Sequence, residues 1–459
     1  MSPSARTSAQ APGGEIHAGF RAGDPGYRAG DPGYRRVAVA VFLGGVVTFS
    51  SLYSTQALLP LLGRGFGIGA GAAATSVAVT TLGMAGGLLL AGPVSDRVGR
   101  TPLMRWSLVV AAALGLLTAV APTWSVLLCL RVGQGLALAF FPATAAAYLR
   151  EEVHPAAHAR ASGLYVGGTA IGGMLGRLVA AVSAHLAGWR WGLFDVGLLA
   201  TVCAALCWRL LPASRGFVSR SAAPVPDGVT VTAAWDGAIR PVPRDDGPAV
   251  RVLRDGAAVS DAPVRLLRLV RDPYLVGMWL LGGLGMGTFV ATFNAIGYRL
   301  TLPPYRLSVA VVGFVFLVYS FGSLASTWAG RAAGRHGRPP VVLTGALVLL
   351  AGVAVTAARP LGLVMAGLVL VTCGFFAVHG VVSGWVAARA QPLGATGRAS
   401  AVYLVVYYLG SSICGTEAGY AWTARGWGGV ALLTGGLSLS AVMVAGVLLL
   451  GPGVGRRPE

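Results

Sequence analysis

The sequence predicts an all-α membrane protein in which twelve transmembrane helices form two pseudo-symmetric six-helix bundles. Three observations lead to this fold class: a composition that is 55% hydrophobic and 11% charged, recurring apolar runs of about twenty residues, and sequence blocks that repeat at one fixed spacing. Soluble domains carry roughly 25% charged residues, so the composition excludes a soluble globular protein.

Each apolar run is long enough to cross a hydrocarbon core of roughly 30 Å. In lipid such a run must be helical, because its backbone groups have to bond within the segment. The expected spans are 37–62, 72–94, 102–121, 124–149, 161–185, 190–212, 274–298, 307–330, 339–358, 361–388, 399–422 and 428–450. A polar stretch, 213–272, is expected to be a cytoplasmic linker between an N-terminal bundle (37–212) and a C-terminal bundle (273–450), with a tail at 451–459.

The first 36 residues contain no apolar core, so no cleavable signal peptide is visible in them. They carry the tandem repeat RAGDPGYRAGDPGY at 21–34. Gly and Pro at this density predict a disordered cytoplasmic tail over 1–36.

All 35 basic residues are arginine, and the formal net charge is +19. These arginines lie between the apolar runs and form no continuous basic patch, which argues against nucleic-acid binding and favours topology signals. With the N-terminus inside, the short inner loops hold ten arginines and the outer loops six, and the linker adds nine to the inner side. We therefore expect a multi-pass protein of the inner (plasma) membrane with both termini in the cytoplasm.

Two pairs of sequence blocks recur at the same offset. AGPVSDRVGRTP (91–102) matches AGRAAGRHGRPP (329–340), with 330 − 92 = 238. The block that begins RASGLY at Arg160 matches the one that begins RASAVY at Arg398, with 398 − 160 = 238. One shared offset predicts an internal duplication, and parallel six-helix repeats with a binding site between them are typical of secondary transporters.

The stretch GPVSDRVGR (92–100), with its degenerate second copy, resembles the signature loop of the Major Facilitator Superfamily. The resemblance extends over 37–450 and implies a secondary transporter with alternating access. Two positions depart from the superfamily pattern: Thr101 stands where a basic residue is usual, and Gly334 stands where the first copy has Asp96.

The residues of this loop predict a conformational latch. Glycines let the helix ends approach closely, and Asp96 can accept hydrogen bonds from a neighbouring helix N-terminus. Arg97 and Arg100 can pair with acids at adjacent helix ends. The latch would hold the outward-facing state and break on the inward swing, and charges that only set the topology are the alternative. Its expected members are Gly92, Asp96, Arg97, Gly99, Arg100, Glu151 and Glu152.

Arg131, Arg177, Asp195 and Glu417 lie inside apolar runs. Such charges cost roughly 2.5–3.5 kcal/mol each unless they are paired or hydrated, so they are functional candidates. Arg131 opens RVGQG, which resembles the helix 4 motif of proton-coupled members of the superfamily, where the arginine is implicated in proton transfer. A purely structural ion pair is the alternative.

Glu417, Arg131 and Asp195 are the predicted proton-coupling residues. Glu417 shares a helix face with Gly410 and Cys414 that is expected to meet another helix, where a partly desolvated carboxylate can exchange protons. Contact with substrate or pairing with Arg177 are the alternatives for Glu417. Asp195 is more readily a structural partner of an arginine, either Arg177 or Arg190.

The stretch GGTAIGGMLGR resembles the helix 5 antiporter motif of the superfamily. Glycines at four-residue spacing allow close helix packing, for which Gly168, Gly172, Gly173 and Gly176 are the candidates. Gly173 stands where proline is usual and Arg177 replaces the last glycine, a variant similar to that of bacterial arabinose-efflux-like permeases.

The resemblance places helices 1, 4, 7 and 10 around a central cavity, so polar and aromatic residues there and on helix 11 become candidate substrate contacts. Interhelical hydrogen bonding is the alternative for each. The candidates are Tyr53, Gln56, Gln134, Arg177, Asn294, Tyr298, His379, Tyr403 and Tyr407.

We predict proton-coupled efflux of a small organic compound, a drug or metabolite, by alternating access. A sugar or metabolite permease that works as a symporter or uniporter is the alternative. The five cysteines lie in apolar runs and no clustered His, Ser/His pair or paired Asp is visible, so we expect no metal, no cofactor and no enzymatic activity. The expected partners are a small-molecule substrate, protons and the lipid bilayer, with a monomer as the functional unit.

Overall fold

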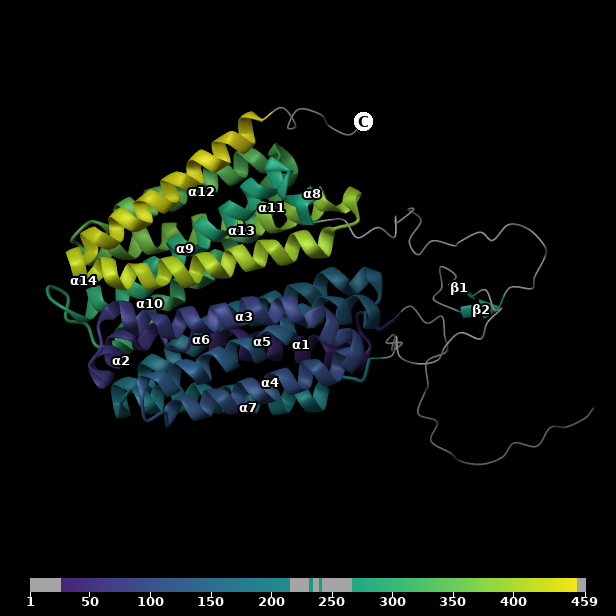
Figure 1. Cartoon of the computed structure of the whole chain (residues 1–459), viewed down its shortest axis with the longest axis horizontal. Coiled ribbons are helices and arrows are strands. Elements are labelled where there is room, and N and C mark those ends of the chain that lie inside the picture. Colours follow the sequence, from purple (N-terminus) through teal and green to yellow (C-terminus); the bar gives the residue numbers. More distant parts are fainter. Residues whose placement is uncertain (1–25, 215–230, 234–238, 242–265, 452–459) are drawn as a thin grey trace, which may run out of the picture. The chain divides into compact units, whose positions relative to one another are not determined.

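The computed structural model describes residues 26–214, 231–233, 239–241 and 266–451. The all-α fold class is confirmed in these residues, because every described element except one short strand pair is a helix (Figure 1). The two strands, β1 (Val231–Ala233) and β2 (Ile239–Pro241), pair antiparallel with Thr232 opposite Arg240. They belong to a compact unit separate from the helices.

The helices follow the expected spans closely. The N-terminal half consists of α1 (Pro32–Leu52), η1 (Gln56–Leu58), α2 (Leu59–Phe66), α3 (Ala70–Val98), α4 (Arg100–Ala119), α5 (Trp124–Glu152), α6 (Pro155–Ala187) and α7 (Trp189–Leu210). The C-terminal half consists of α8 (Leu266–Val270), α9 (Pro273–Thr301), α10 (Val309–Val315), η2 (Phe316–Val318), α11 (Tyr319–His336), α12 (Arg338–Thr356), α13 (Leu361–Ala390), η3 (Gln391–Leu393) and α14 (Thr396–Leu450).

The last helix contains two membrane spans. Eleven described segments are long and apolar enough to cross a membrane, and α14 is one of them with 55 residues. A straight helix of that length would measure about 80 Å, far more than a bilayer core needs. The backbone of α14 leaves helical geometry at Arg425 and Gly426, where the chain turns back. Counting α14 twice gives 11 + 1 = 12 spans, the predicted number.

The internal duplication is visible in the turns between helices. Gly99, between α3 and α4, has φ 93°, and Gly337, between α11 and α12, has φ 86°. Gly188 (φ 90°) and Gly426 (φ 56°) form a second such pair. Both pairs are separated by 238 residues, the offset of the sequence blocks. Positive φ is costly for residues with a Cβ, so glycine allows consecutive helices to reverse with almost no loop.

The glycine stripe of α6 packs against α1. A Cβ at Gly168, Gly172 or Gly176 would lie within 2.5 Å of backbone atoms of Phe42, Val46 and Ser50, respectively. The four-residue spacing on α6 therefore meets the same spacing on α1. Gly173 differs, because its nearest neighbour is the guanidinium of Arg177 on the same helix.

The expectation of a disordered tail is wrong for its last residues. Tyr27 is buried and pairs through its backbone with Glu152 and His154, and α1 begins at Pro32. The ring of Tyr27 occupies the space beside Gly33 that a side chain there would fill. The buried tyrosine ring packs this part of the repeat against the helices, although its Gly and Pro content suggested disorder. Residues 1–25 lie outside the described residues.

Some expected boundaries also need correction. The helix α6 begins at Pro155, six residues before the expected start at 161, and α11 ends at His336, six residues beyond 330. Most of the expected linker (213–272) lies outside the described residues, but Leu266–Val270 form the short helix α8. Polar residues at these helix ends ended the apolar runs in sequence without ending the helices.

The chain enters and leaves the helices at one end, which we call the terminal end; α1 begins there and α7 ends there (right in Figure 1). The two halves contact each other toward the opposite end. Thr81 of α3 bonds Ser412 of α14 with 2.7 Å between their hydroxyl oxygens, and Gly313 of α10 lies beside Ala181 of α6. In the described residues, no hydrogen bond joins the halves near the terminal end, so the halves are closed at the opposite end.

Candidate functional site

The contact between the halves is centred on two amide side chains. Gln56 of η1 donates from Nε2 to Oδ1 of Asn294 in α9 at 2.7 Å, and both side chains are buried. Asn294 in turn donates to the carbonyl of Gly415 in α14 at 3.0 Å. Tyr298, one turn beyond Asn294, donates its hydroxyl to the carbonyl of Leu59 at 3.0 Å. These bonds bring together three residues predicted on helices 1 and 7.

Arg177 lies beside this pair with 2% of its surface exposed. Its Nε donates to Oε1 of Gln56 at 2.6 Å, and its Nη1 donates to the carbonyl of Gly173 on the same helix. Within the described part of the chain, it contacts no carboxylate. In these residues Arg177 therefore forms neither the pair with Asp195 nor the pair with Glu417 that the sequence offered as alternatives.

Aromatic rings surround the guanidinium of Arg177. Its Cζ lies 4.6 Å from the ring centre of Tyr53, 5.2 Å from that of Phe316 and 4.7 Å from that of Tyr319. Tyr53 comes from the N-terminal half, whereas Phe316 and Tyr319 come from the C-terminal half. Cation–π attraction stabilises a cation over such faces. The charge is thus covered by groups that separate when the halves move apart.

A continuous group of aromatic rings leads away from Tyr319 through the C-terminal half. Phe289 lies 5.0 Å from Tyr319 and stacks on Phe375 at 4.4 Å between ring centres. His379 is stacked against Phe375 at 5.8 Å and lies 4.9 Å from the ring of Tyr407. His379 also bonds through Nδ1 with the hydroxyl of Tyr403 at 2.8 Å. The candidates His379, Tyr403 and Tyr407 therefore belong to one aromatic cluster that reaches Arg177.

Arg131 of α5 is fully buried and has a different environment. Its guanidinium donates to the carbonyls of Ser51 and Leu52 at 2.8 and 2.7 Å. These are the last carbonyls of α1, which have no partner within the helix. Further bonds reach the carbonyl of Ser76 and the hydroxyl of Ser54. Arg131 thus caps the C-terminal end of α1, where the helix dipole favours a positive charge.

Gln134 shares the environment of Arg131 rather than that of Arg177. Its Oε1 accepts from Arg131 at 2.6 Å, and its Nε2 donates to the carbonyl of Ala111 in α4 at 3.0 Å. Both ends of the amide are used inside the N-terminal half. Gln134 therefore forms interhelical hydrogen bonds, the alternative to the predicted contact with a substrate in the cavity.

Glu417 and Asp195 do not occupy the positions that the sequence suggested. Glu417 is exposed and shares its helix face with Ile413, which is 59% exposed. The contact of α14 with α9 passes from Cys414, beside Gly287, to Gly415 and does not include Glu417. Asp195 is half-buried, and no arginine in the described residues pairs with it.

The partners expected for Asp195 are bound elsewhere. Arg190 donates to the carbonyls of Ala119 and Ala121 at the end of α4, and Arg177 donates to Gln56. Backbone carbonyls at a helix end satisfy a guanidinium without any acid. The sequence could not reveal these partners because every residue has a carbonyl.

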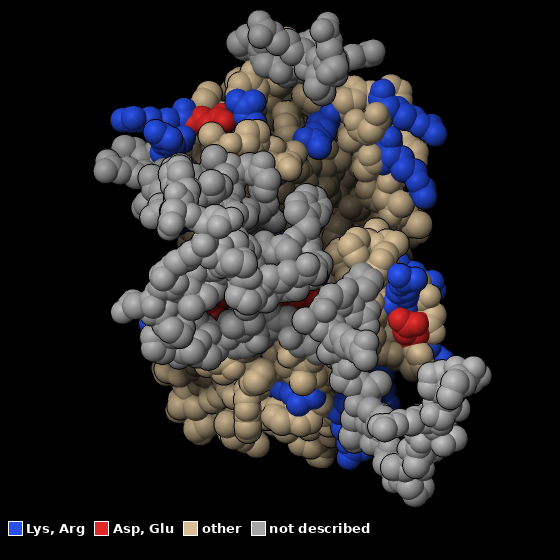
Figure 2. Space-filling model, turned by 90° about the vertical axis from the view of Figure 1, so that its right-hand side faces the viewer, with Lys and Arg blue, Asp and Glu red and all other residues tan. Residues whose placement is uncertain are grey.

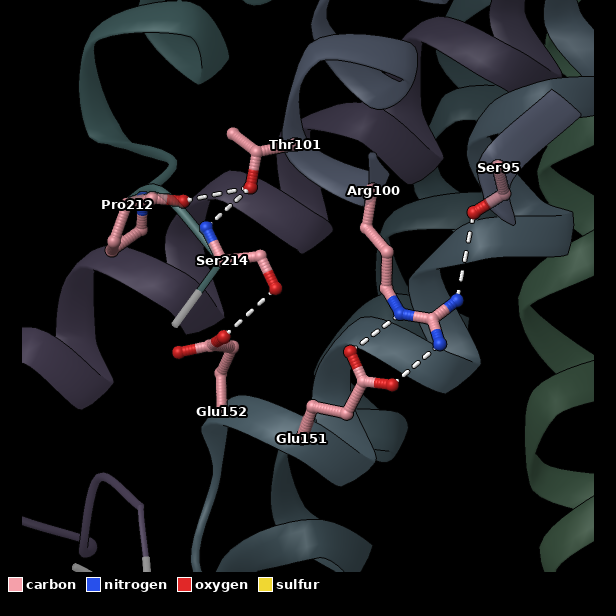
Figure 3. A network of polar contacts seen from close by, with 7 residues as sticks. All are labelled: Ser95, Arg100, Thr101, Glu151, Glu152, Pro212 and Ser214. Atoms are coloured by element: carbon pink, nitrogen blue, oxygen red, sulfur yellow. Dashed lines mark hydrogen bonds and ion pairs between the residues drawn. The ribbon is translucent and has the colours of Figure 1, made fainter. Parts of the chain in front are cut away.

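The loop charges form a network at the terminal end (Figure 3). Arg100 forms a two-bond ion pair with Glu151, with Nε and Oε2 2.5 Å apart. This expected pairing is confirmed, but it joins α4 to α5 within one half, so it cannot by itself hold the two halves together. Glu152 is buried and accepts from the hydroxyl of Ser214 at 3.0 Å.

Thr101, which stands where the superfamily usually has a basic residue, uses its hydroxyl group in two hydrogen bonds. Its hydroxyl donates to the carbonyl of Pro212 at 3.1 Å and accepts from the backbone N–H of Ser214 at 2.9 Å (Figure 3). It therefore ties α4 to the chain that leaves α7.

Asp96 and Arg97 are exposed at the end of α3. The terminal end carries more basic than acidic side chains on its visible surface (Figure 2).

Sequence reasoning missed Phe316 and Tyr319, the two rings from the C-terminal half that cover Arg177. Both lie in an uninterrupted apolar run, so nothing in their spacing marked them. The duplication could have identified them, because their equivalents in the N-terminal half are Ala78 (316 − 238 = 78) and Thr81 (319 − 238 = 81). Both Ala78 and Thr81 are hydrogen-bonded to Ser412 across the interface between the halves.

The model of the Major Facilitator Superfamily matches residues 41–415. The inner membrane transport protein YnfM of Escherichia coli (strain K12) is 37% identical over 422 residues, covering 92% of this chain and 91% of YnfM. The MFS-type transporter YybF of Bacillus subtilis (strain 168) is 33% identical over 413 residues, covering 90% and 93%.

Among solved structures, a variant of the nucleoside transporter NupG aligns with a TM-score of 0.64 at 13% identity, covering 90% of this chain and 99% of NupG. At that identity the match supports the fold alone. Together these matches point to a transporter rather than to an enzyme.

Proposed function

Because the chain belongs to the Major Facilitator Superfamily, whose members transport solutes by alternating access, we propose that it exports a small organic compound across the cell membrane. One observation carries the proposal: the halves are hydrogen-bonded to each other only toward the opposite end, around Gln56 and Asn294, in the described residues. Polar and aromatic side chains gather at that contact, where a substrate would meet both halves.

The proposed orientation places both termini, and with them the terminal end, in the cytoplasm of a plasma-membrane protein. The arginines of the short loops and the basic terminal face support it (Figure 2). In that orientation the bonds between the halves in the described residues lie on the side away from the cytoplasm, which favours loading of substrate from inside the cell. We propose that a single chain suffices, since the duplicated halves supply both sides of the site.

Proton exchange would drive this export in the proposed mechanism, as the RVGQG stretch around Arg131 suggests. A carrier must then be a titratable group that meets both sides of the membrane in turn. Asp195, half-buried in α7, and Glu417, exposed on α14, are the two acids inside the apolar runs of the sequence. The latch residues Asp96, Arg97 and Arg100 would act at the terminal end when it closes.

A permease that works as a uniporter or symporter is a second candidate function. It is favoured by a specific observation: in the described residues none of the buried arginines Arg131, Arg177 and Arg299 contacts a carboxylate. Proton release driven by a neighbouring arginine requires such a contact.

Everted membrane vesicles with an acidic interior separate the two candidates. Compounds are added from a panel of drugs and metabolites, and a pH-sensitive dye reports proton loss, with vesicles that lack the protein as the control. Compound-triggered proton loss supports proton-coupled export. Compound entry into the vesicles without proton loss, together with facilitated uptake by intact cells, would replace it by the permease.

A further inference from the structure

Arg177 differs from the other buried arginines of the chain in how its charge is satisfied. Arg131 and Arg299, the other two buried arginines of the described residues, each donate to carbonyls at the C-terminal end of a helix, as does the exposed Arg190. Arg177 lies at no helix end, and one of its two bonds goes to a carbonyl of its own helix. Its Nη2 has no hydrogen-bond acceptor among the described residues. A buried cation with an unused donor has the chemistry of a ligand site.

Tyrosine hydroxyl groups lie in the same place. The hydroxyl of Tyr319 is buried and has no hydrogen-bond partner in the described residues, although its ring flanks Arg177. The hydroxyl of Tyr53, whose ring flanks Arg177 from the other half, is buried with the hydroxyl of Ser411 beside it. Buried polar groups are nearly always bonded, so orphaned donors in one cluster indicate an absent acceptor.

The duplication shows that the fold does not need a charge at this position. Gly415 is the counterpart of Arg177, since 415 − 177 = 238, and Asn294 is the counterpart of Gln56 at the same offset. In the C-terminal half, Asn294 simply bonds the carbonyl of Gly415. The same architecture is therefore built there with no side chain at all. Arg177 adds a positive charge to one half only, which points to recognition rather than to folding.

From these observations we infer that Arg177, Tyr53 and Tyr319 form a binding site for an organic anion with an aromatic body. A carboxylate, or another anionic oxygen group, accepts from Nη2 of Arg177 and from the two tyrosine hydroxyls. The aromatic body packs against the rings that begin at Phe289. Phe316 and Tyr319 leave the guanidinium when the halves separate at the opposite end, which lets the anion go. This inference rests on the proposed function and names its substrate class.

A pair of isosteric probes tests the site on the purified full-length protein. Binding of 2-naphthoate is compared with binding of 2-naphthamide, which has the same ring system and no charge. A charge-assisted hydrogen bond contributes about 1.5–3 kcal/mol, so naphthoate should bind at least about tenfold more tightly. Arg177→Gln should abolish this preference, and Arg177→Lys should keep part of it. Tyr319→Phe retains the ring and removes only the hydroxyl, so it should weaken naphthoate binding while leaving naphthamide binding unchanged.

Arg299→Gln is the matched control, because Arg299 is a buried arginine that also lies over an aromatic ring, that of Trp427, but points to a helix end. It should leave the preference intact. Equal affinities of the wild-type protein for the two probes, absence of naphthoate binding, or an undiminished preference in Arg177→Gln would each overturn the inference.

Flux measurements in proteoliposomes separate this inference from the proposed function. 2-Naphthalenesulfonate, which keeps its charge and does not cross lipid freely, serves as the transported anion. Selective binding of the anion without flux would support the anion site and contradict the proposed transport. Flux of neutral compounds that is independent of Arg177 would leave transport in place and remove the anion site.

Discussion

Gln56 and Asn294 occupy equivalent positions of the two halves and are hydrogen-bonded to each other at 2.7 Å, 238 residues apart in the chain. Two equivalent residues can meet in this way only beside the axis that relates the repeats. The contact therefore lies beside the axis between the halves, about which a rocking motion opens one end and closes the other. Arg177 and Gly415, bonded to these two residues, lie on either side of it.

A disulfide at the opposite end should stop transport. Thr81 and Ser412 come from different halves, and their hydroxyl oxygens are 2.7 Å apart, so Thr81→Cys with Ser412→Cys should crosslink under mild oxidation. The background should lack the five native cysteines, because Cys414 lies two residues from Ser412. Since the halves must part here during the cycle, flux should fall to background on oxidation and return on reduction.

The two single-cysteine variants serve as controls and should keep their flux under oxidant. Full transport by the crosslinked protein, verified by gel mobility after cleavage between the halves, would mean that this interface does not open during the cycle.

Close packing of α6 on α1 predicts opposite effects for two neighbouring glycines. Gly172→Ala places a Cβ within 2.5 Å of the backbone of Val46, whereas a Cβ at Gly167 meets nothing within 4 Å. Overpacking typically costs about 1–3 kcal/mol, and replacing an unhindered helical glycine by alanine gains up to about 1 kcal/mol. Thermal unfolding in detergent should therefore give a lower midpoint for Gly172→Ala and an equal or higher one for Gly167→Ala. Equal midpoints for both variants would contradict the packing.

The sequence was sufficient for the helices, the duplication and the α6 glycines, because hydrophobic length and residue spacing determine those features directly. The sequence was not sufficient to predict which neighbouring helix each single side chain faces. Gly410 and Cys414 of α14 do pack on α9, but the contact continues at Gly415, so Glu417 remains outside it.

The partner of Arg131 was hidden for a different reason. The helix α1 ends at Leu52, before the short helix η1, and the carbonyls of Ser51 and Leu52 at this end accept from the guanidinium. No local pattern marked this break inside a long apolar run. The sequence therefore suggested an acid as the partner, although carbonyl groups provide the compensation.

The capping role of Arg131 predicts a loss of stability rather than a selective loss of coupling. Arg131→Gln would leave the buried carbonyl of Leu52 without its donor and remove one donor from that of Ser51, and an unsatisfied buried acceptor costs about 1–3 kcal/mol. Arg131→Lys should also be destabilised, since one ammonium group cannot reproduce the planar fork. Chemical or thermal unfolding of the purified variants measures this effect. Wild-type stability combined with loss of proton-linked flux would instead assign Arg131 to coupling.

Neutralising Glu417 should have almost no effect on transport. Its side chain is exposed beside Ile413, and no buried charge depends on it in the described residues. Substitutions at such surface positions usually change stability by no more than about 0.5 kcal/mol. Initial flux of Glu417→Gln in proteoliposomes should therefore stay within about twofold of the wild-type value, with and without a pH gradient.

Asp195→Asn is the matched variant, because Asp195 is the other acid inside an apolar run and is half-buried. If proton coupling exists, its loss in Asp195→Asn and its retention in Glu417→Gln would identify the carrier, whereas loss in Glu417→Gln alone would show that α14 rotates to bring Glu417 inward during the cycle.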